Sequence, residues 1–369
     1  MSHPTVYIHM GVACITNTLR RLHDGILHFQ IYLAKMTTPA IMKALVYSSY
    51  SGASALSVKA IPAPVPTLNQ VLVKVAAASI NKGDLVLLDG TTLAVRLAAG
   101  HPIGPNPDSV IGSDFAGVVH AVGANVTKFH VGDEVYGQVD FTTGRGSFAE
   151  FVCMSETDTM CLKPTNLTFV EAAAMPCAAQ TALQTIRDDG GVKSGSKVVI
   201  NGASGGVGSY AIQIAKALGA HVTAVCITAN AGNARELGAN VVVDCLSEDF
   251  VQQCHGQADV HMDYVGNRSM RENCRVLAEH GTYVTAGGPP ETFFGRMVCL
   301  MALKPFVSQR LVLGMLKPSQ HLLESLKELA EAGHITPRVT AQFDLAHAVD
   351  AFRLFEQGHV QGKIVVTIP

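Results

Sequence analysis

The sequence predicts an α/β protein that combines a β-rich, barrel-like unit with a doubly wound parallel β-sheet. Residues 42–163 contain short apolar runs separated by Gly and Pro, for example at 71–75 and 115–119, a pattern typical of all-β units. From about residue 166 onward, strand-like and helix-like segments alternate, which indicates βαβ units and therefore a parallel sheet. A third observation is a glycine-rich turn between one such strand and the next helix.

The composition is that of a folded chain with sizeable cores. The 369 residues correspond to two or three domains of ~150 residues. The 48% share of hydrophobic residues against 15% charged residues excludes a disordered chain. A formal net charge of -2 lacks the basic excess of a dedicated nucleic-acid binder, so we expect no strong nucleic-acid binding. No apolar run reaches the ~18 residues that cross a bilayer, so we also expect no membrane-spanning segment.

The first 41 residues and the cysteines bear on the compartment. Nine scattered cysteines without a CxxC pair favour reduced thiols in an intracellular protein, and we expect a cytoplasmic one. Residues 1–41 contain two arginines and one acid, Asp24, so a mitochondrial presequence is the alternative. They are otherwise an unstructured extension, or Met36 or Met42 is the true start.

The second half predicts a series of parallel strands. We expect them at residues 197–200, 221–226, 241–244, 259–263 and 281–286. Uninterrupted β-branched runs at 198–200 and 241–243 are typical of strands that are covered on both faces. Helices are expected at residues 170–186 (apart from Pro176), 207–218 and, as the last one, 322–332, before a final strand at 362–366.

The glycine-rich turn predicts a dinucleotide site. Compared with the pattern G-x-G-x-x-G, Ala203 takes the place of the first glycine, and Gly205 and Gly208 hold the second and third. Gly205 lets the backbone approach a diphosphate, and Gly208 lets the helix lie close to its strand. The free N–H groups at the helix start then hold the anion, whereas the alternative is a tight turn without a ligand. The predicted cofactor contacts of the turn are Ser204, Gly205, Gly206, Val207 and Gly208.

The segment that follows the second parallel strand favours NADPH over NADH. An acid at this place binds the ribose 2′-hydroxyl in NAD-dependent folds. No Asp or Glu occurs between Gly205 and Arg235, so a 2′-phosphate is not repelled there. Thr228 and Asn230 are the polar residues of this segment that we expect at the cofactor.

Further stretches, taken in order, resemble a known superfamily. They are Ser-Ile-Asn-Lys-Gly-Asp at 79–84, Ile-Gly-Ser-Asp-Phe-Ala-Gly-Val-Val at 111–119, Gly-Asp-Glu-Val-Tyr-Gly at 132–137, Gly-Ser-Phe-Ala-Glu-Phe at 146–151, residues 172–181 and Leu-Gly-Ala at 237–239. Together with the glycine turn, they make residues 42–369 similar to the medium-chain dehydrogenase/reductases, most of all to the zeta-crystallin-like quinone oxidoreductase branch. The resemblance implies a GroES-like catalytic domain, residues 42–166 plus 318–369, around an inserted Rossmann domain, residues 167–317. It also implies a homodimer or homotetramer.

The resemblance implies a zinc-independent enzyme. Zinc-dependent relatives carry Gly-His-Glu at the positions of Gly112, Ser113 and Asp114, a cysteine near Asn81, and a four-cysteine lobe. Here no cysteine lies between residues 14 and 153, whereas tetrahedral zinc needs several N or S ligands. We therefore expect no metal.

The family places particular residues at the reaction. A conjugated acceptor takes a hydride readily when the enzyme orients it against the nicotinamide. The resemblance places Asn81 beside the substrate or the cofactor ribose, and Thr181 at the carboxamide; a plain turn residue is the alternative for Asn81. Asp84 either assists proton delivery or orders its own loop.

The strand ends of the parallel sheet supply further candidates, because ligands lie at the carboxyl ends of such strands. Backbone contacts to the cofactor are expected from Val265, Gly266, Ala286, Gly287 and Gly288. Lys363 is expected to reach the cofactor or to be a solvated lysine at a strand end.

The predicted function is NADPH-dependent hydride transfer to a small hydrophobic quinone or activated enone. Leucine and valine at 85–88 replace a tyrosine that many quinone and enoyl-thioester reductases of the family carry as a proton donor. Its absence lowers the enoyl-thioester alternative and makes the pocket wall more apolar. The remaining alternative is a cofactor-binding structural or RNA-binding protein with little turnover, as some relatives are thought to be.

Overall fold

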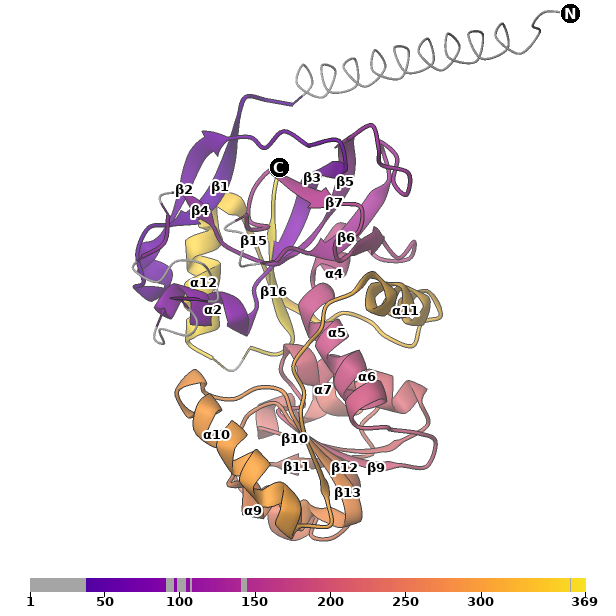
Figure 1. Cartoon of the computed structure of the whole chain (residues 1–369). Coiled ribbons are helices and arrows are strands. Elements are labelled where there is room, and N and C mark those ends of the chain that lie inside the picture. The colour runs from indigo at the N-terminus through magenta and orange to yellow at the C-terminus, as the bar shows by residue number, and fades with distance from the viewer. Residues whose placement is uncertain (1–37, 91–95, 98–103, 107, 141–144, 359) are drawn as a thin grey trace, which may run out of the picture.

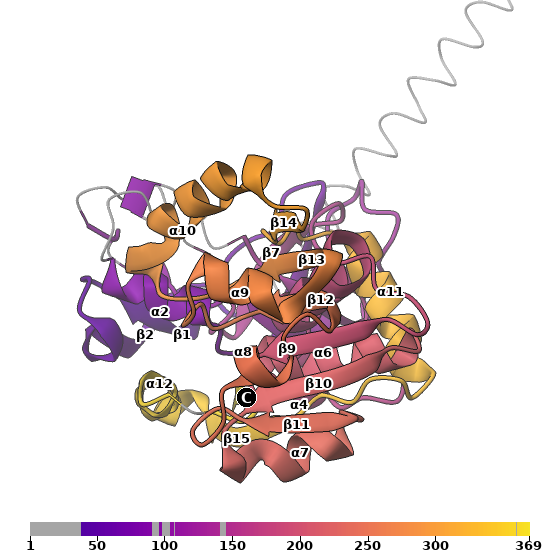
Figure 2. The same cartoon turned by 90° about the horizontal axis from the view of Figure 1, so that it is seen from below.

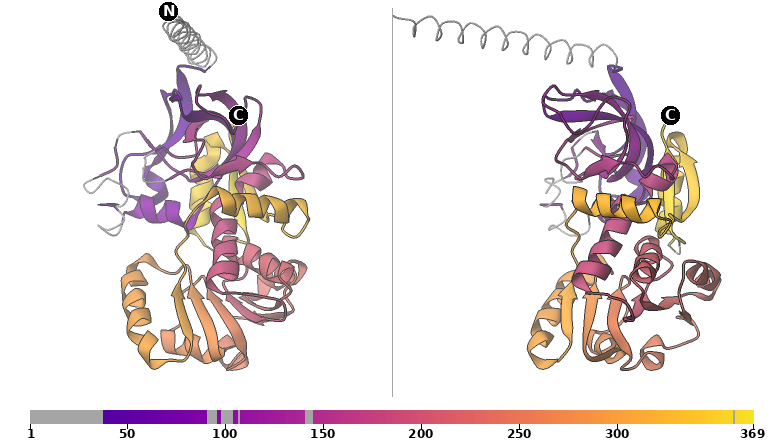
Figure 3. Two further views of the ribbon diagram at one scale, coloured as in Figure 1. Left: turned by 45° about the vertical axis from the view of Figure 1, so that its right-hand side comes forward. Right: turned by 90° about the vertical axis from the view of Figure 1, so that its right-hand side faces the viewer.

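The computed structural model describes residues 38–90, 96–97, 104–106, 108–140, 145–358 and 360–369. Residues 1–37, on which the presequence prediction mainly depends, lie outside this part of the chain. Two sheet-containing units are stacked end to end, and the strand that begins at Ile41 lies in the same unit as the C-terminus (Figures 1 and 3). Among the described residues, no helix is long and apolar enough to span a membrane.

The first unit is built from strands contributed by both ends of the chain, and all its strand pairs are antiparallel except β15 with β16. Strands β2 (Leu56–Pro62), β1 (Ile41–Tyr47) and β4 (Ser109–Val110) form a small sheet in that order. The larger sheet has the order β15-β16-β3-β5-β6-β8, and β7 also pairs with β3. Its strands are β3 (Gln70–Ser79), β5 (Asp114–Val122), β6 (Glu134–Gln138), β7 (Phe151–Ser155), β8 (Met160–Leu162), β15 (Val339–Asp344) and β16 (Lys363–Thr367).

The pairing of β16 with β3 positions the site. Val365 lies opposite Ser79 in an antiparallel register, so the start of β16 is held beside the chain that leaves β3. Two helices that the sequence analysis did not predict complete this unit: α2 (Lys82–Asp89) and α12 (Ala348–Glu356). They pack on the barrel core through Leu88 and Phe352, both fully buried. The helix at 322–332 is therefore not the last one.

The second unit is a parallel sheet with the strand order β11-β10-β9-β12-β13-β14. Its strands are β9 (Lys197–Asn201), β10 (His221–Cys226), β11 (Val241–Asp244), β12 (Ala258–Asp263), β13 (Leu277–Thr285) and β14 (Arg310–Leu313). This is the 3-2-1-4-5-6 order of dinucleotide-binding folds, with its crevice at the carboxyl ends of β9 and β12. The α/β prediction is confirmed, although β14 was not predicted.

Helices cover both faces of this sheet (Figure 2). Helices α6 (Gly206–Ala217) and α7 (Ala231–Glu236) pack on one apolar cluster, which also contains α5 (Pro176–Leu183). Helices α8 (Phe250–Gln253), α9 (Met270–Val276) and α10 (Pro290–Leu303) pack on the other. The remaining helices are α4 (Phe169–Ala173) and α11 (Gln320–Glu331). Burial on both faces explains the continuous β-branched run of β9. The same expectation is wrong for β11, which is the edge strand of the sheet and leaves Val241 exposed.

The predicted helix at 170–186 is divided at Pro176. Proline has no backbone N–H and is tolerated only in a first turn, so α4 ends and α5 begins there. A π-helical turn, Gln184–Asp189, follows α5 directly. Helix α4 contacts β3 and β5, while α5 contacts α6, so this segment connects the two units at the level of the crevice.

Candidate functional site

The glycine-rich turn connects β9 to α6, as predicted. The left-handed residue of the turn is Gly202, with φ +85°, one position before Ala203. A Cβ on Gly202 would lie 2.7 Å from Cγ2 of Val265. The tight-turn role that the motif alignment gave to position 203 therefore belongs to Gly202.

The glycines of the turn divide into two groups by what surrounds them. A Cβ on Gly208 would lie 2.1 Å from the carbonyl oxygen of Gly202, so the protein's own packing requires glycine there. A Cβ on Gly205 would meet only that same oxygen, at 3.6 Å, and one on Gly206 would lie 3.1 Å from Cδ of Lys363. The chain's own backbone does not require glycine at 205 and 206, which fits a ligand pressed against them.

The start of α6 has the features that an anion site requires. The helix begins at Gly206, and its N-cap residue Gly205 provides no side-chain cap. The first N–H groups of any helix lack intrahelical partners. These groups and the positive end of the helix dipole can hold a diphosphate.

The ribose end of the crevice contains Asn230 and Thr228. Asn230 is buried and donates from Nδ2 to Oγ of Ser204 over 2.9 Å. Its Oδ1 atom has no hydrogen-bond partner among the described residues, which leaves an acceptor for a ligand hydroxyl. The hydroxyl of Thr228 donates to the carboxylate of Asp244.

Asp244 is a residue that sequence reasoning missed. It ends β11 beside the end of β10, where Cys226 is its register partner. The Thr228 hydroxyl, above all, lowers the pKa of its carboxyl. The residues that directly follow β10 in the sequence contain no acid, but the parallel pairing of β10 with β11 puts the carboxylate of Asp244 beside them.

Asn81 stands at the centre of a buried polar network. It is the N-cap residue of α2, and its Nδ2 donates to Oγ of Ser113 over 3.1 Å. Its Oδ1 accepts from Nζ of Lys363 over 2.5 Å, and the same ammonium donates to the carbonyl oxygen of Ile80 over 2.9 Å. The two partners fix the orientation of the Asn81 amide.

Two buried carboxyl groups adjoin this network. Asp84 accepts the backbone N–H of Asn81 over 2.7 Å, and burial raises the pKa of its carboxyl to about 7. Burial also raises the pKa of Asp114, against the lowering effect of Lys363, whose Nζ lies 3.6 Å from Oδ2. Asp84 thus makes the loop-ordering contact that was one of its two expected roles.

Lys363 joins the turn to the Asn81 network. Lys363 as a whole is only 3% exposed, so the interpretation of this residue as a solvated lysine is wrong. The preceding N–H, that of Gly362, donates to the carbonyl oxygen of Ser204 over 3.0 Å. The first residues of β16 therefore hold the two halves of the predicted site together.

Thr181 lies on α5 beside this region. It is buried, and its hydroxyl donates to the carbonyl oxygen of Cys177 over 2.8 Å, which leaves the oxygen lone pairs to accept. The backbone N–H of Cys177 donates to Asp114 over 3.0 Å, so α5 begins at the network. Leu85, Leu87 and Leu88 belong to the barrel core.

The strand-end residues gather at the carboxyl ends of β12 and β13, together with Arg296 of α10. Gly266 and Gly288 have φ values of +72° and +105°. The Arg296 guanidinium lies against both, and it donates from Nη1 to the carbonyl oxygen of Gly287 over 2.6 Å. The sequence analysis did not single out Arg296. The remaining predicted residues of this group are Val265 and Ala286.

The donor set near Asn81 does not fit a zinc ion. Asn81 and Ser113 bond to each other, and an ammonium lies beside the Asp114 carboxylate. The nearby Cys177 has a thiol whose pKa is raised to about 12 by burial, so it is not a thiolate ligand. In the described ranges, no three His, Cys, Asp or Glu residues are grouped to hold a metal.

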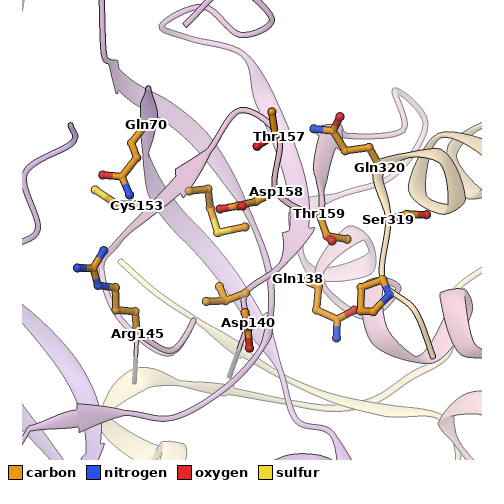
Figure 4. Close-up of a pocket in the computed structure, with 13 residues that line it drawn as sticks. Gln70, Gln138, Asp140, Arg145, Cys153, Thr157, Asp158, Thr159, Ser319 and Gln320 are labelled. Carbon is orange, nitrogen blue, oxygen red and sulfur yellow. The ribbon is translucent and has the colours of Figure 1, made fainter. Parts of the chain in front are cut away.

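A cavity of about 950 Å³ lies on the barrel unit next to α11 (Figure 4). Its lining includes Gln138, Asp140, Arg145 and Gln320. Gln138 accepts a hydrogen bond of 3.1 Å from Gln180, the neighbour of Thr181 on α5. None of the predicted site residues lines this cavity, so it is separate from the glycine turn.

The fold and the turn define a two-domain protein with a dinucleotide crevice between its domains. A family model for the alcohol dehydrogenase GroES-like domain matches residues 67–165, and one for zinc-binding dehydrogenases matches residues 237–366. "NAD(P)H oxidoreductase RTN4IP1, mitochondrial" of Bos taurus is 34% identical, over 81% of this chain and 82% of that protein. "NADPH-dependent alkenal/one oxidoreductase, chloroplastic" of Arabidopsis thaliana is 31% identical, over 90% of this chain and 81% of that protein.

Comparison with solved structures supports the same family. The quinone oxidoreductase from Coxiella burnetii superposes with a TM-score of 0.79 and 30% identity, over 89% of this chain and all of that one. The chain belongs to the medium-chain dehydrogenase/reductase superfamily, in its quinone oxidoreductase branch, and is an oxidoreductase. Membership supports a nicotinamide cofactor without deciding between NADH and NADPH.

Proposed function

We propose that the protein is an NADPH-dependent reductase for small hydrophobic quinones or activated enones. The observation that carries this proposal is the bridge from the glycine turn through Lys363 to Asn81, because it joins the turn proposed for the dinucleotide to a buried polar network. The relatives named as quinone and alkenal/one oxidoreductases support the acceptor class. With it we propose domain limits of 42–166 plus 318–369 and 167–317.

The cofactor is assigned to residues that surround the crevice. The backbone of 204–208 holds the diphosphate at the start of α6, and Asn230 offers its unpartnered Oδ1 to the ribose. Thr228 stands at the same end. The nicotinamide end is assigned to Thr181, Lys363, Val265, Gly266, Ala286, Gly287 and Gly288.

We keep NADPH as the proposed cofactor because the Asp244 carboxylate is occupied by the chain's own donors and is not free to bind a ribose 2′-hydroxyl, although its negative charge disfavours a 2′-phosphate. It accepts from Thr228, from Oγ of Ser247 over 3.0 Å and from the N–H of Leu246 over 3.1 Å. We expect a higher kcat/KM with NADPH than with NADH, and the reverse order would contradict this choice. Asp244→Asn removes a negative charge at this edge and should raise the NADPH preference by about threefold to tenfold.

The reduced nicotinamide supplies the hydride, and the chain's residues orient and protonate the acceptor. The Asn81 amide donates to Ser113 and also hydrogen-bonds to the Asp114 carboxylate, so it would exchange one of these partners for the acceptor oxygen. Asp84 carries a proton at pH values below about 7 and is the candidate source for the reduced product.

Turnover with a panel of acceptors tests the proposal. Purified protein and NADPH are mixed with quinones, enones or enoyl thioesters, and the loss of reduced-nicotinamide absorbance is followed. Consumption with quinones or enones supports the proposal. Preference for thioesters would establish the enoyl-thioester alternative, and tight binding without consumption would establish the structural or RNA-binding alternative. Asn81→Ala should lower kcat by about tenfold or more while NADPH binding stays unchanged.

We also propose a location and an assembly. The protein is cytoplasmic if its mature form begins at Met36 or Met42, and mitochondrial if residues 1–41 act as a presequence. Subcellular fractionation of cells that express the full reading frame separates the two, because presequence removal after residue 41 and translation from Met42 give the same amino terminus. We propose a homodimer or homotetramer, and its interface is argued at the end of the Discussion.

A further inference from the structure

Arg296 occupies space in the proposed cofactor crevice. It lies on the second turn of α10 and is buried enough that its side chain is only 17% exposed. A Cβ built on Gly288 would fall 1.8 Å from its Nη1, and one built on Gly266 would fall 2.1 Å from the same atom. The guanidinium is therefore seated in the hollow that the two missing side chains leave.

The contacts of the guanidinium cross the ends of both strands. Nη1 donates to the carbonyl oxygen of Gly287, and Nη2 donates to the hydroxyl of Thr285 and, over 3.4 Å, to the carboxylate of Asp263. Two of these acceptors are neutral. The third is the carboxylate of Asp263, with which Arg296 forms an ion pair of 3.4 Å.

Asp263 does not depend on Arg296. Its Oδ1 accepts from Asn201 over 3.0 Å and from the N–H groups of Val265 and Gly266 over 3.1 and 2.8 Å. Its Oδ2 accepts from the Tyr283 hydroxyl over 2.7 Å. The buried carboxylate keeps four neutral donors when the guanidinium leaves, so it stays hydrogen-bonded although it loses the ion pair.

The hollow adjoins the glycine turn. Val265, the residue before Gly266, contacts Gly202 at the start of that turn. A dinucleotide that lies on the turn and touches Gly266 and Gly288 would need the volume that the guanidinium fills.

We propose that Arg296 is a latch on the cofactor crevice, which the nicotinamide end of the dinucleotide must displace in order to bind. This inference rests on the proposed function, since it concerns the same crevice. Binding then breaks the three guanidinium contacts, and part of the affinity is lost in doing so.

Titration of the purified full chain with NADPH tests the latch. Arg296→Ala should lower the Kd for NADPH by about tenfold, although it removes a positive charge that would attract the cofactor. Arg296→Lys keeps the charge, reaches less far and should also tighten binding. Arg353→Ala, on an exposed arginine of α12 paired with Asp350, is the charge-matched control and should bind like wild type. An unchanged or raised Kd in both Arg296 variants would overturn the latch.

Chemical modification gives a second readout that does not depend on a variant. The protein is treated with phenylglyoxal with and without NADPH, and the peptide that contains Arg296 is quantified by mass spectrometry. Release of the latch should increase modification of Arg296 in the presence of NADPH, whereas unchanged or reduced modification would contradict the latch. If wild type does not bind NADPH at all, the proposed function itself fails, which is a separate result.

Discussion

Asp84 and Asp114 are two buried carboxyl groups that share one buried ammonium, that of Lys363. The ammonium lies 3.6 Å from Asp114 and acts on Asp84 only through space. A single positive charge does not balance two negative charges in a medium of low dielectric constant. Desolvation therefore keeps a proton on Asp84 until about pH 7, which makes this residue a proton store beside Asn81.

Asp84→Asn should reduce the dependence of stability on pH. The folded-state pKa of Asp84 lies above that of the unfolded chain, so its stabilisation is complete below about pH 4 and is lost as the pH rises through about 7. We expect wild type to lose about 2–4 kcal/mol more than Asp84→Asn between pH 4 and 8, measured by urea unfolding. Asp350→Asn, at an exposed ion pair, should follow wild type. Parallel curves for wild type and Asp84→Asn would contradict the raised pKa.

At the scale of elements, the turn between β9 and α6 needs glycine for two different reasons. The packing demand is that no Cβ fits against the chain's own atoms, and the binding demand is that a ligand must approach the backbone. The packing demand falls on Gly202 and Gly208, where backbone atoms or a positive φ leave no room for a side chain. The binding demand falls on Gly205, which has an ordinary φ of −74° and free space around it. The two demands can therefore be separated by mutation.

Gly208→Ala should lower the stability of the fold, whereas Gly205→Ala should weaken NADPH binding. In Gly208→Ala the new Cβ meets backbone atoms at 2.1–2.8 Å, so we expect a loss of about 3 kcal/mol or failure to fold. In Gly205→Ala, stability should stay within about 0.5 kcal/mol, while the Kd for NADPH rises by about tenfold or more. Thermal unfolding and calorimetric titration measure the two effects. Normal NADPH binding by Gly205→Ala would show that no diphosphate approaches this residue.

Local sequence patterns predicted those elements whose identity depends on local chemistry. The β9–turn–α6 unit follows from its β-branched run and its glycines, and β16 was predicted from residues 362–366. Asp244, Arg296 and the burial of Lys363 depend on which strands and helices become neighbours. No local pattern carries that information, because partners such as Lys363 and Asn81 are 282 residues apart in the chain.

At the scale of the whole molecule, the parallel sheet ends in a strand without a covered outer edge. In the described part of the chain, β14 pairs only with β13, and α10 lies beside it. Phe294, Val298 and Met301 form an apolar stripe on α10 and are 69%, 47% and 64% exposed. An open edge strand next to such a stripe pairs readily with a second copy of itself. Two copies of β14 related by a two-fold axis would continue the sheet across a dimer.

Val298→Glu should therefore convert the dimer to a monomer, because it places a charge in the middle of the apolar stripe at each symmetry-related contact. The molar mass of wild type and variant, measured by light scattering after size exclusion, checks this. Leu246→Glu is the matched control, since Leu246 is exposed beyond β11 at the opposite edge of the same sheet. A monomeric wild type would contradict the assembly, and a dimer that survives Val298→Glu would place its interface elsewhere. Because α10 also carries Arg296, loss of the dimer should change the Kd for NADPH in wild type more than in Arg296→Ala.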